Sequence, residues 1–231
     1  MAKILHLETS AFNCSVSLSD ERKLLSTNSE TSDKYIHSER LHVFIDSCMK
    51  EAGLQPNDLD AISLSRGPGS YTGLRIGTSA AKGLCYALNI PLIAMDTWKI
   101  IFAQIKSIHK DDYDCYVPLI DARRMEAYSI VLDATGSPIH ETRSVVWDDN
   151  PWSAQVNKKT LFAGDAAKKF ELVSENPQWH FDTDIFPDSK YMVDLAVEQY
   201  EKGHFEDVAY FEPFYLKDFI AGKPKDLLKR K

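Results

Sequence analysis

Cysteine pairs, long apolar runs and an excess of basic residues are all missing from this sequence. Its 231 residues include four cysteines, none of them in a Cys-x-x-Cys pair, which argues against a disulfide framework or a zinc ribbon. No apolar stretch is long enough for a signal core or a membrane span, so we expect a cytoplasmic protein with reduced thiols and no membrane partner. The net charge of −7 disfavours an extended basic face, so we do not expect this chain to bind RNA on its own.

Glycine patterns that bind phosphate are also missing. The sequence has no Gly-x-x-x-x-Gly-Lys-Ser/Thr motif, and the dinucleotide pattern fails at Thr72, where its third glycine would stand. Residues 8–12, after the first apolar run, contain no glycine, and Gly164-Asp165 is followed by two alanines. Backbone amides that would neutralise phosphate charge are therefore not expected at either place. We expect no cofactor on this chain alone.

The densest run of special residues is Ser-Arg-Gly-Pro-Gly-Ser-Tyr-Thr-Gly-Leu-Arg-Ile-Gly at 65–77. The apolar run at 62–64 predicts a short buried strand. The Gly-Pro-Gly sequence ends that strand, because glycine permits unusual backbone angles and proline cannot continue a ladder. Ser70 is suited to cap a helix, and apolar and small residues follow at helical spacing over 71–88. We therefore predict a tight turn from strand to helix.

This predicted helix carries a nearly bare stripe. Gly73, Gly77 and Ala81 recur every four residues and so share one face. Each interior glycine costs about 1 kcal/mol of helix stability relative to alanine. Close packing of the helix on its own sheet would offset that cost, and so would a second helix from another chain lying on the stripe. The spacing indicates close approach and leaves both explanations open.

Periodicity predicts a mixed α/β protein that repeats one order of elements. An opening strand at 2–7 and two more at 14–18 and 24–28 form a meander. The rest of the first half is a helix at 38–52, the strand and helix described above, a strand at 91–95 and a helix at 97–108. In the second half we predict strands at 116–120, 127–132, 139–147 and 160–163, and helices at 166–174 and 192–200. We expect two lobes, residues 1–110 and 111–231, joined by an exposed acidic link at 111–114, with the last segment able to pack back on the first lobe.

Acidic residues follow the first strand of each predicted lobe. Glu8 and Asp121 lie where open α/β sheets usually place ligands, and Arg123 comes shortly after Asp121. A guanidinium group at a strand end could reach a phosphate or a carboxylate of a partner. A surface pair between arginine and carboxylate explains the same residues at least as well, and for Glu8 we expect local hydrogen bonds.

Particular residues carry a family resemblance. The paired lobes resemble the ribonuclease H-like fold of actin, hexokinase and Hsp70-type ATPases. More specifically, the chain resembles the bacterial TsaB family, once grouped with the M22 peptidases. The resemblance runs nearly end to end and is thinnest from about 147 to 210. It rests on Leu-Glu-Thr-Ser at 7–10, Cys-Ser-Val at 14–16, His-Ser-Glu at 37–39, the glycine-rich run at 66–77, Ile-Asp-Ala-Arg at 120–123 and Pro-Phe-Tyr-Leu at 213–216.

The resemblance implies a non-catalytic paralogue of TsaD. TsaD is the subunit that transfers a threonylcarbamoyl group to N6 of the adenosine beside the anticodon of tRNA. A protein of this family would bind TsaD as a heterodimer and activate it, pair with itself when alone, and join a TsaE-type ATPase in a larger complex. It would meet tRNA only through that complex, with ATP and metal held by TsaD and TsaE.

The family also implies a location for the interface, on the helices at 38–52 and 71–88. The predicted interface residues are Leu41, Ile45, Gly73, Ile76, Gly77, Ala80, Ala81 and Leu84. On this basis Gly77→Leu should leave the monomer folded and abolish partner binding, because a side chain there would hold two helices apart.

Two alternatives belong to other classes of protein. The first is an active enzyme, either an ATP-dependent phosphotransferase or an M22-like metallopeptidase. A TsaD-like site needs a helical His-x-x-x-His pair that shares a metal, whereas His37 and His42 are five residues apart and point roughly 140° away from each other on a helix. The second is a self-associating scaffold unrelated to tRNA, which the bare stripe alone would permit. The basic end at 223–231 fits a solvated tail, and the sequence assigns it no further role.

Overall fold

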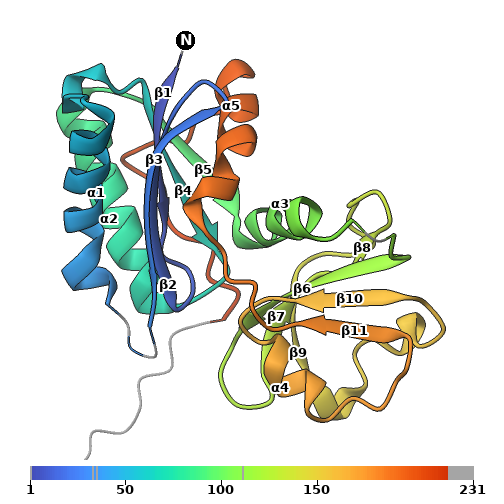
Figure 1. Cartoon of the computed structure of the whole chain (residues 1–231). Coiled ribbons are helices and arrows are strands. Elements are labelled where there is room, and N and C mark those ends of the chain that lie inside the picture. The colour runs from blue at the N-terminus through green and yellow to red at the C-terminus, as the bar shows by residue number, and fades with distance from the viewer. Residues whose placement is uncertain (1, 33, 35, 111, 218–231) are drawn as a thin grey trace, which may run out of the picture.

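Two mixed β-sheets, each with helices packed on it, organise the computed structural model of the chain (Figure 1). The structure describes residues 2–32, 34, 36–110 and 112–217, so the basic end at 223–231 lies outside the described residues. Each sheet contains an antiparallel meander of three strands, β1-β2-β3 in the first sheet and β6-β7-β9 in the second. This arrangement confirms the predicted two-lobe α/β fold.

The first sheet has the strand order β3-β2-β1-β4-β5. β4 and β5 run parallel to β1, so the carboxyl ends of these three strands meet at one edge, where Glu8 lies. The strands are β1 (Lys3–Glu8), β2 (Asn13–Asp20), β3 (Lys23–Thr31), β4 (Ala61–Gly67) and β5 (Leu92–Asp96). A short 3-10 helix, η1 (Pro56–Asp58), precedes β4.

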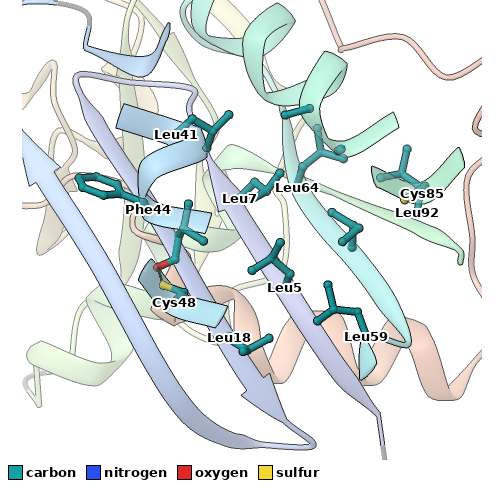
Figure 2. Packing of buried hydrophobic residues seen from close by; sticks show 14 of the residues in the cluster. Leu5, Leu7, Leu18, Leu41, Phe44, Cys48, Leu59, Leu64, Cys85 and Leu92 are labelled. Atoms are coloured by element: carbon teal, nitrogen blue, oxygen red, sulfur yellow. Dashed lines mark hydrogen bonds between the residues drawn. The ribbon is translucent and has the colours of Figure 1, made fainter. Parts of the chain in front are cut away.

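Two helices cover one face of this sheet, α1 (His37–Ala52) and α2 (Tyr71–Leu88) (Figure 1). Successive strand residues point to opposite faces, so Leu5 and Leu7 of β1 point toward the helices. There they join Leu41 and Phe44 of α1 in the core (Figure 2). Each fully buried side chain of this kind contributes about 1.5–3 kcal/mol.

His6 lies on the opposite face of β1 and is fully buried. Its Nδ1 is 2.7 Å from the Ser63 hydroxyl and its Nε2 is 2.9 Å from the Ser19 hydroxyl. Burial lowers the pKa of His6 to about 3, because a charged imidazolium would lose its hydration there. His6 is therefore neutral over the working range of pH.

The second sheet has the order β11-β10-β6-β7-β9, with β8 pairing with β6 beside this path. Its strands are β6 (Cys115–Asp121), β7 (Glu126–Ser129), β8 (Leu132–Asp133), β9 (Arg143–Val146), β10 (Thr160–Ala163) and β11 (Trp179–Asp182). Three short helices accompany them: η2 (Trp147–Asp149), η3 (Ser153–Gln155) and α4 (Ala167–Glu171). Between the two sheets lies α3 (Thr97–Ile108), whose Ile101 and Ile105 pack against Tyr116 and Leu161 of the second sheet (Figure 1).

After the second sheet the chain returns to the first one. η4 (Ser189–Met192) and α5 (Val193–Glu201) cover the face opposite α1 and α2 (Figure 1). The Ser189 N–H donates to the Ser15 hydroxyl at 2.9 Å, and the Ser189 and Ser17 hydroxyls are 2.6 Å apart. The division of the chain into lobes at residue 110 stays a prediction. In the structure, residues after 188 pack on one face of the first sheet.

Several local predictions about the second half need correction. Tyr113, expected in an exposed link, is buried among aromatic side chains of the second lobe. The strand expected at 127–132 is divided into β7 and β8, and the one expected at 139–147 is shortened to β9. β11 is not among the predicted strands, because its residues are Trp-His-Phe-Asp without aliphatic alternation. Parallel pairing with β10 forms this strand. No helix in the described part of the chain is long and apolar enough to cross a membrane.

Candidate partner interface

A groove of about 780 Å³ runs along the outer side of α2, beside α1. α2 begins as predicted, because the Ser70 hydroxyl caps the helix by accepting the Gly73 N–H at 3.2 Å. The groove is lined by Ser38 and His42 of α1 and by Tyr71, Thr72, Arg75, Ile76, Ser79, Ala80, Gly83 and Leu84 of α2.

The floor of this groove is apolar, and its rim carries cationic or hydroxyl-bearing side chains. Ile76 and Leu84 are half-buried and present apolar surface, while His42 and Arg75 are exposed at the rim. None of the described residues that line the groove is acidic. Gly83 offers no side chain, and nothing lies within 4 Å of the place where its Cβ would be. Another backbone can therefore come close to α2 at this position.

The bare stripe of α2 points into the protein, away from the groove. A Cβ built on Gly73 would lie 2.1 Å from the carbonyl oxygen of Thr9, and one on Gly77 would lie 2.3 Å from the Thr9 hydroxyl. Ala81 is fully buried in the core. The glycines therefore allow α2 to approach the end of β1, which is the first of the two explanations that the spacing left open.

This placement corrects half of the predicted interface. Leu41, Gly73, Gly77 and Ala81 are buried within this chain, so no partner can cover them without unfolding it. Ile76, Ala80 and Leu84 do line the groove, whereas Ile45 is half-buried against the core and outside the lining. The expectation that Gly77→Leu leaves a folded monomer is also corrected, because the new side chain would collide with Thr9.

The sequence reasoning missed the polar part of the groove, although a signal for it was present. Arg75, Ser79 and Gly83 also recur every four residues. They follow Gly73, Gly77 and Ala81 by two positions, which is about 200° around a helix. The two stripes must therefore face opposite ways, and the one that carries Arg75 is the one suited to solvent.

The predicted carboxylate at the end of β1 is fully buried. Glu8 Oε1 accepts the Ser10 N–H at 2.6 Å and the Ser65 hydroxyl at 2.9 Å, as the expected local hydrogen bonds. Its Oε2 is also buried, with no hydrogen-bond partner among the described residues. Burial raises the pKa of Glu8 to about 7, and the charge of Asp188 adds to this effect.

The equivalent carboxylate of the second lobe is held differently. Asp121 pairs with Lys169, and its carboxylate accepts the Arg123 N–H at 3.2 Å. Its own N–H donates to Asp165 at 2.8 Å. The sequence reasoning did not single out Asp165, although it follows β10 after a glycine; burial and the charges of Asp121 and Glu8 raise its pKa to about 7.

Asp121 and the exposed Arg123 border a cavity of about 360 Å³ between the lobes, whereas Glu8 does not line it. Contact of these three residues with a ligand or partner stays a prediction. In the part of the chain that the structure describes, no three metal-ligating side chains come together.

Comparison with known proteins places this architecture in a family. The sequence profile of TsaD, described as tRNA N6-adenosine threonylcarbamoyltransferase, matches residues 29–149, which include both groove helices. The chain is 26% identical to the tRNA threonylcarbamoyladenosine biosynthesis protein TsaB of Haemophilus influenzae, over 95% of each chain. It is 33% identical to TsaB of Bacillus subtilis over 54% of this chain and 53% of that one.

A solved structure supports the same grouping. A Pseudomonas aeruginosa protein, described as uncharacterized and similar to the peptidase YeaZ, matches 94% of this chain and all of its own with a TM-score of 0.81 and 26% identity. The two lobes and their meander-led sheets define an actin-like α/β protein. The chain belongs to the TsaD family and, within it, to the TsaB proteins.

Proposed function

We propose that this chain acts in tRNA threonylcarbamoyladenosine biosynthesis as a non-catalytic subunit that binds and activates TsaD. Its relatives are named for this biosynthesis, and the matching profile is that of the transferase. The observation that carries the proposal is the α1–α2 groove. Exposed apolar surface with a polar rim is typical of protein interaction sites, and a helix of the partner is a suitable occupant.

The rim of the groove favours a partner with acidic side chains. Arg75 is exposed, and its guanidinium can donate two parallel hydrogen bonds to one carboxylate. A TsaD helix would therefore lay apolar residues on Ile76 and Leu84 and place a carboxylate opposite Arg75. A second copy of this chain would use the same groove when TsaD is absent.

The histidines support a non-catalytic role. His37 is buried, with Nε2 3.3 Å from the Asn13 carbonyl oxygen, and burial lowers its pKa. His42 lines the groove instead. The two imidazoles therefore lie in different environments and do not form a metal-binding pair. In this proposal ATP and metal belong to TsaD and a TsaE-type ATPase, and tRNA reaches this chain through the complex.

Gly83→Arg is expected to abolish complex formation with TsaD from the same organism. The arginine fills the open space over Gly83, where no atom lies within 4 Å of the built Cβ, and so prevents close approach of a partner backbone. We expect the dissociation constant to rise at least about 100-fold. Light scattering on a sizing column, with this chain alone and mixed with TsaD, measures the change as loss of the one-to-one complex.

Ser107→Arg is the matched control, because it adds the same side chain at an exposed position in the last turn of α3, outside the groove. This variant should bind TsaD as the wild type does, and both variants should keep the circular dichroism spectrum of the folded protein. A wild-type chain that forms no complex, even with ATP and tRNA present, would contradict the proposal. In that case the enzymatic alternatives would be tested by ATP hydrolysis and metal content.

A further inference from the structure

Residues 211–217, which we call the strap, run from the first lobe toward the second. The Phe214 N–H donates to the Arg66 carbonyl at 2.7 Å, and Lys82 Nζ of α2 donates to the Phe211 carbonyl at 3.1 Å. At the end of β4, Gly67 has φ +111°, and a Cβ there would lie 2.7 Å from the Phe214 carbonyl oxygen. The backbone of β4 is thus shaped to receive the strap, and the described chain ends between the lobes (Figure 1).

The strap contacts two side chains that also line the α1–α2 groove. The ring of Tyr215 lies 4.8 Å from the ring of Tyr71. The Arg75 guanidinium also packs on the Tyr71 ring, 4.4 Å from the centroid of that ring. A hydrogen bond with Tyr215 raises the pKa of Arg75, so the same guanidinium is tied to the strap and exposed to the groove.

The other end of the strap reaches the second lobe. Lys217 pairs with Glu126 of β7. Residues 214–217 line the cavity between the lobes together with Asp121, Arg123 and Tyr128. Tyr71 and Thr72 border this cavity as well as the groove, so the two spaces meet at the first turn of α2, where Tyr215 packs on Tyr71.

We infer that the strap couples the partner groove to the cavity between the lobes, so that a partner in the groove and a docked strap stabilise each other. This inference rests on the proposed function. A docked strap fixes Tyr71 and Arg75 before the partner arrives, and side chains fixed in advance lose less freedom on binding. The partner, by covering Tyr71 and Arg75, holds in place the surface on which Tyr215 lies.

Coupling of this kind must act in both directions. Loss of strap contacts should weaken partner binding, although neither Tyr215 nor Lys217 lines the groove. Conversely, partner binding should slow hydrogen exchange of the Phe214 amide, which the bond to Arg66 protects. A strap that merely covers the surface would show neither effect.

The test measures TsaD affinity and hydrogen exchange with the full-length chain. Tyr215→Ala should weaken TsaD binding about tenfold, and Lys217→Ala should weaken it in the same direction by less. Tyr210→Ala is the matched control, because Tyr210 is 85% exposed and precedes the strap; this variant should bind as the wild type does. In the wild type, the peptide that contains Phe214 should exchange more slowly when TsaD is bound.

The outcomes separate this inference from the proposed function. If the wild type binds TsaD and the folded strap variants bind equally well, the coupling is wrong and the proposed function stands. Unchanged exchange at Phe214 in the wild-type complex would also overturn the coupling. If the wild type does not bind TsaD, the proposed function fails and the coupling with it.

Discussion

Gly73→Ala should cost more than about 3 kcal/mol of the free energy of unfolding and leave much of the protein unfolded at 37 °C. The added Cβ would lie 2.1 Å from the Thr9 carbonyl oxygen and 3.3 Å from its carbonyl carbon. Both are backbone atoms at the end of β1, so no rotamer change can make room. The helix or the strand must move, and the core between them would be opened. Urea unfolding followed by circular dichroism measures the loss as a lower midpoint.

Gly83→Ala in the same helix is the matched control. Its new methyl group meets no atom within 4 Å, and alanine is the better helix former by about 1 kcal/mol. This variant should therefore unfold at a higher urea concentration than the wild type. If Gly73→Ala were as stable as the wild type, the bare stripe would not face β1 and the placement of α2 would be wrong.

Glu8→Gln should stabilise the protein above pH 7 and change little near pH 4.5. In the folded protein the pKa of Glu8 is about 7, above the ordinary value of 4.5, so the folded state keeps a proton that the unfolded chain releases. The stability that wild-type Glu8 contributes is therefore full below pH 4.5 and is lost as pH rises through 7. Glutamine cannot ionise and keeps an oxygen for Ser10 and Ser65, so at pH 8 the gain should be on the order of 3 kcal/mol.

The measurement is the difference in unfolding free energy between variant and wild type at several pH values from 4.5 to 8.5. His6 makes the wild-type profile alone hard to interpret, because its pKa of about 3 gives a loss of stability as pH falls below 6.5, opposite in sign to that of Glu8. Subtraction removes this effect, since both proteins contain His6.

Glu198→Gln provides a control of opposite sign. A hydrogen bond from Lys202 at 2.5 Å lowers the pKa of this exposed glutamate, so its contribution is present above pH 4.5 and is lost on acidification. The variant should be slightly less stable than the wild type at pH 8 and equal to it at low pH. A Glu8→Gln profile without a rise between pH 5 and 8 would show that Glu8 does not hold a proton in the folded state.

The elements of the first half could be predicted because their signals are local. Ser70, the Gly-Pro-Gly turn and the spacing over 71–88 define α2 without knowledge of the rest of the chain, and α2 has those bounds. β11 could not be found in this way, because pairing with β10 rather than its own composition makes it a strand.

The direction of the bare stripe could not be predicted for a related reason. A stripe of small residues indicates that another element packs closely against the helix. That element can be a sheet of the same chain or a helix of another chain. The position of Thr9 decides between them, and it depends on how β1 ends beneath α2. Arg75 and Ser79 indicate the direction of the bare stripe, because a polar stripe on the opposite side of α2 is the side that faces solvent.

The hydrogen bonds between Ser189 and the hydroxyls of Ser15 and Ser17 join residues made early in synthesis to residues made near its end. On the ribosome, β1 and β2 emerge first, yet the face that carries His6 and Ser17 stays uncovered until η4 and α5 have also emerged. The first lobe therefore completes its folding after the whole second lobe has been translated. A ribosome stalled before residue 189 would carry a first sheet with one face, which includes Ile4 and Ile93, open to chaperones.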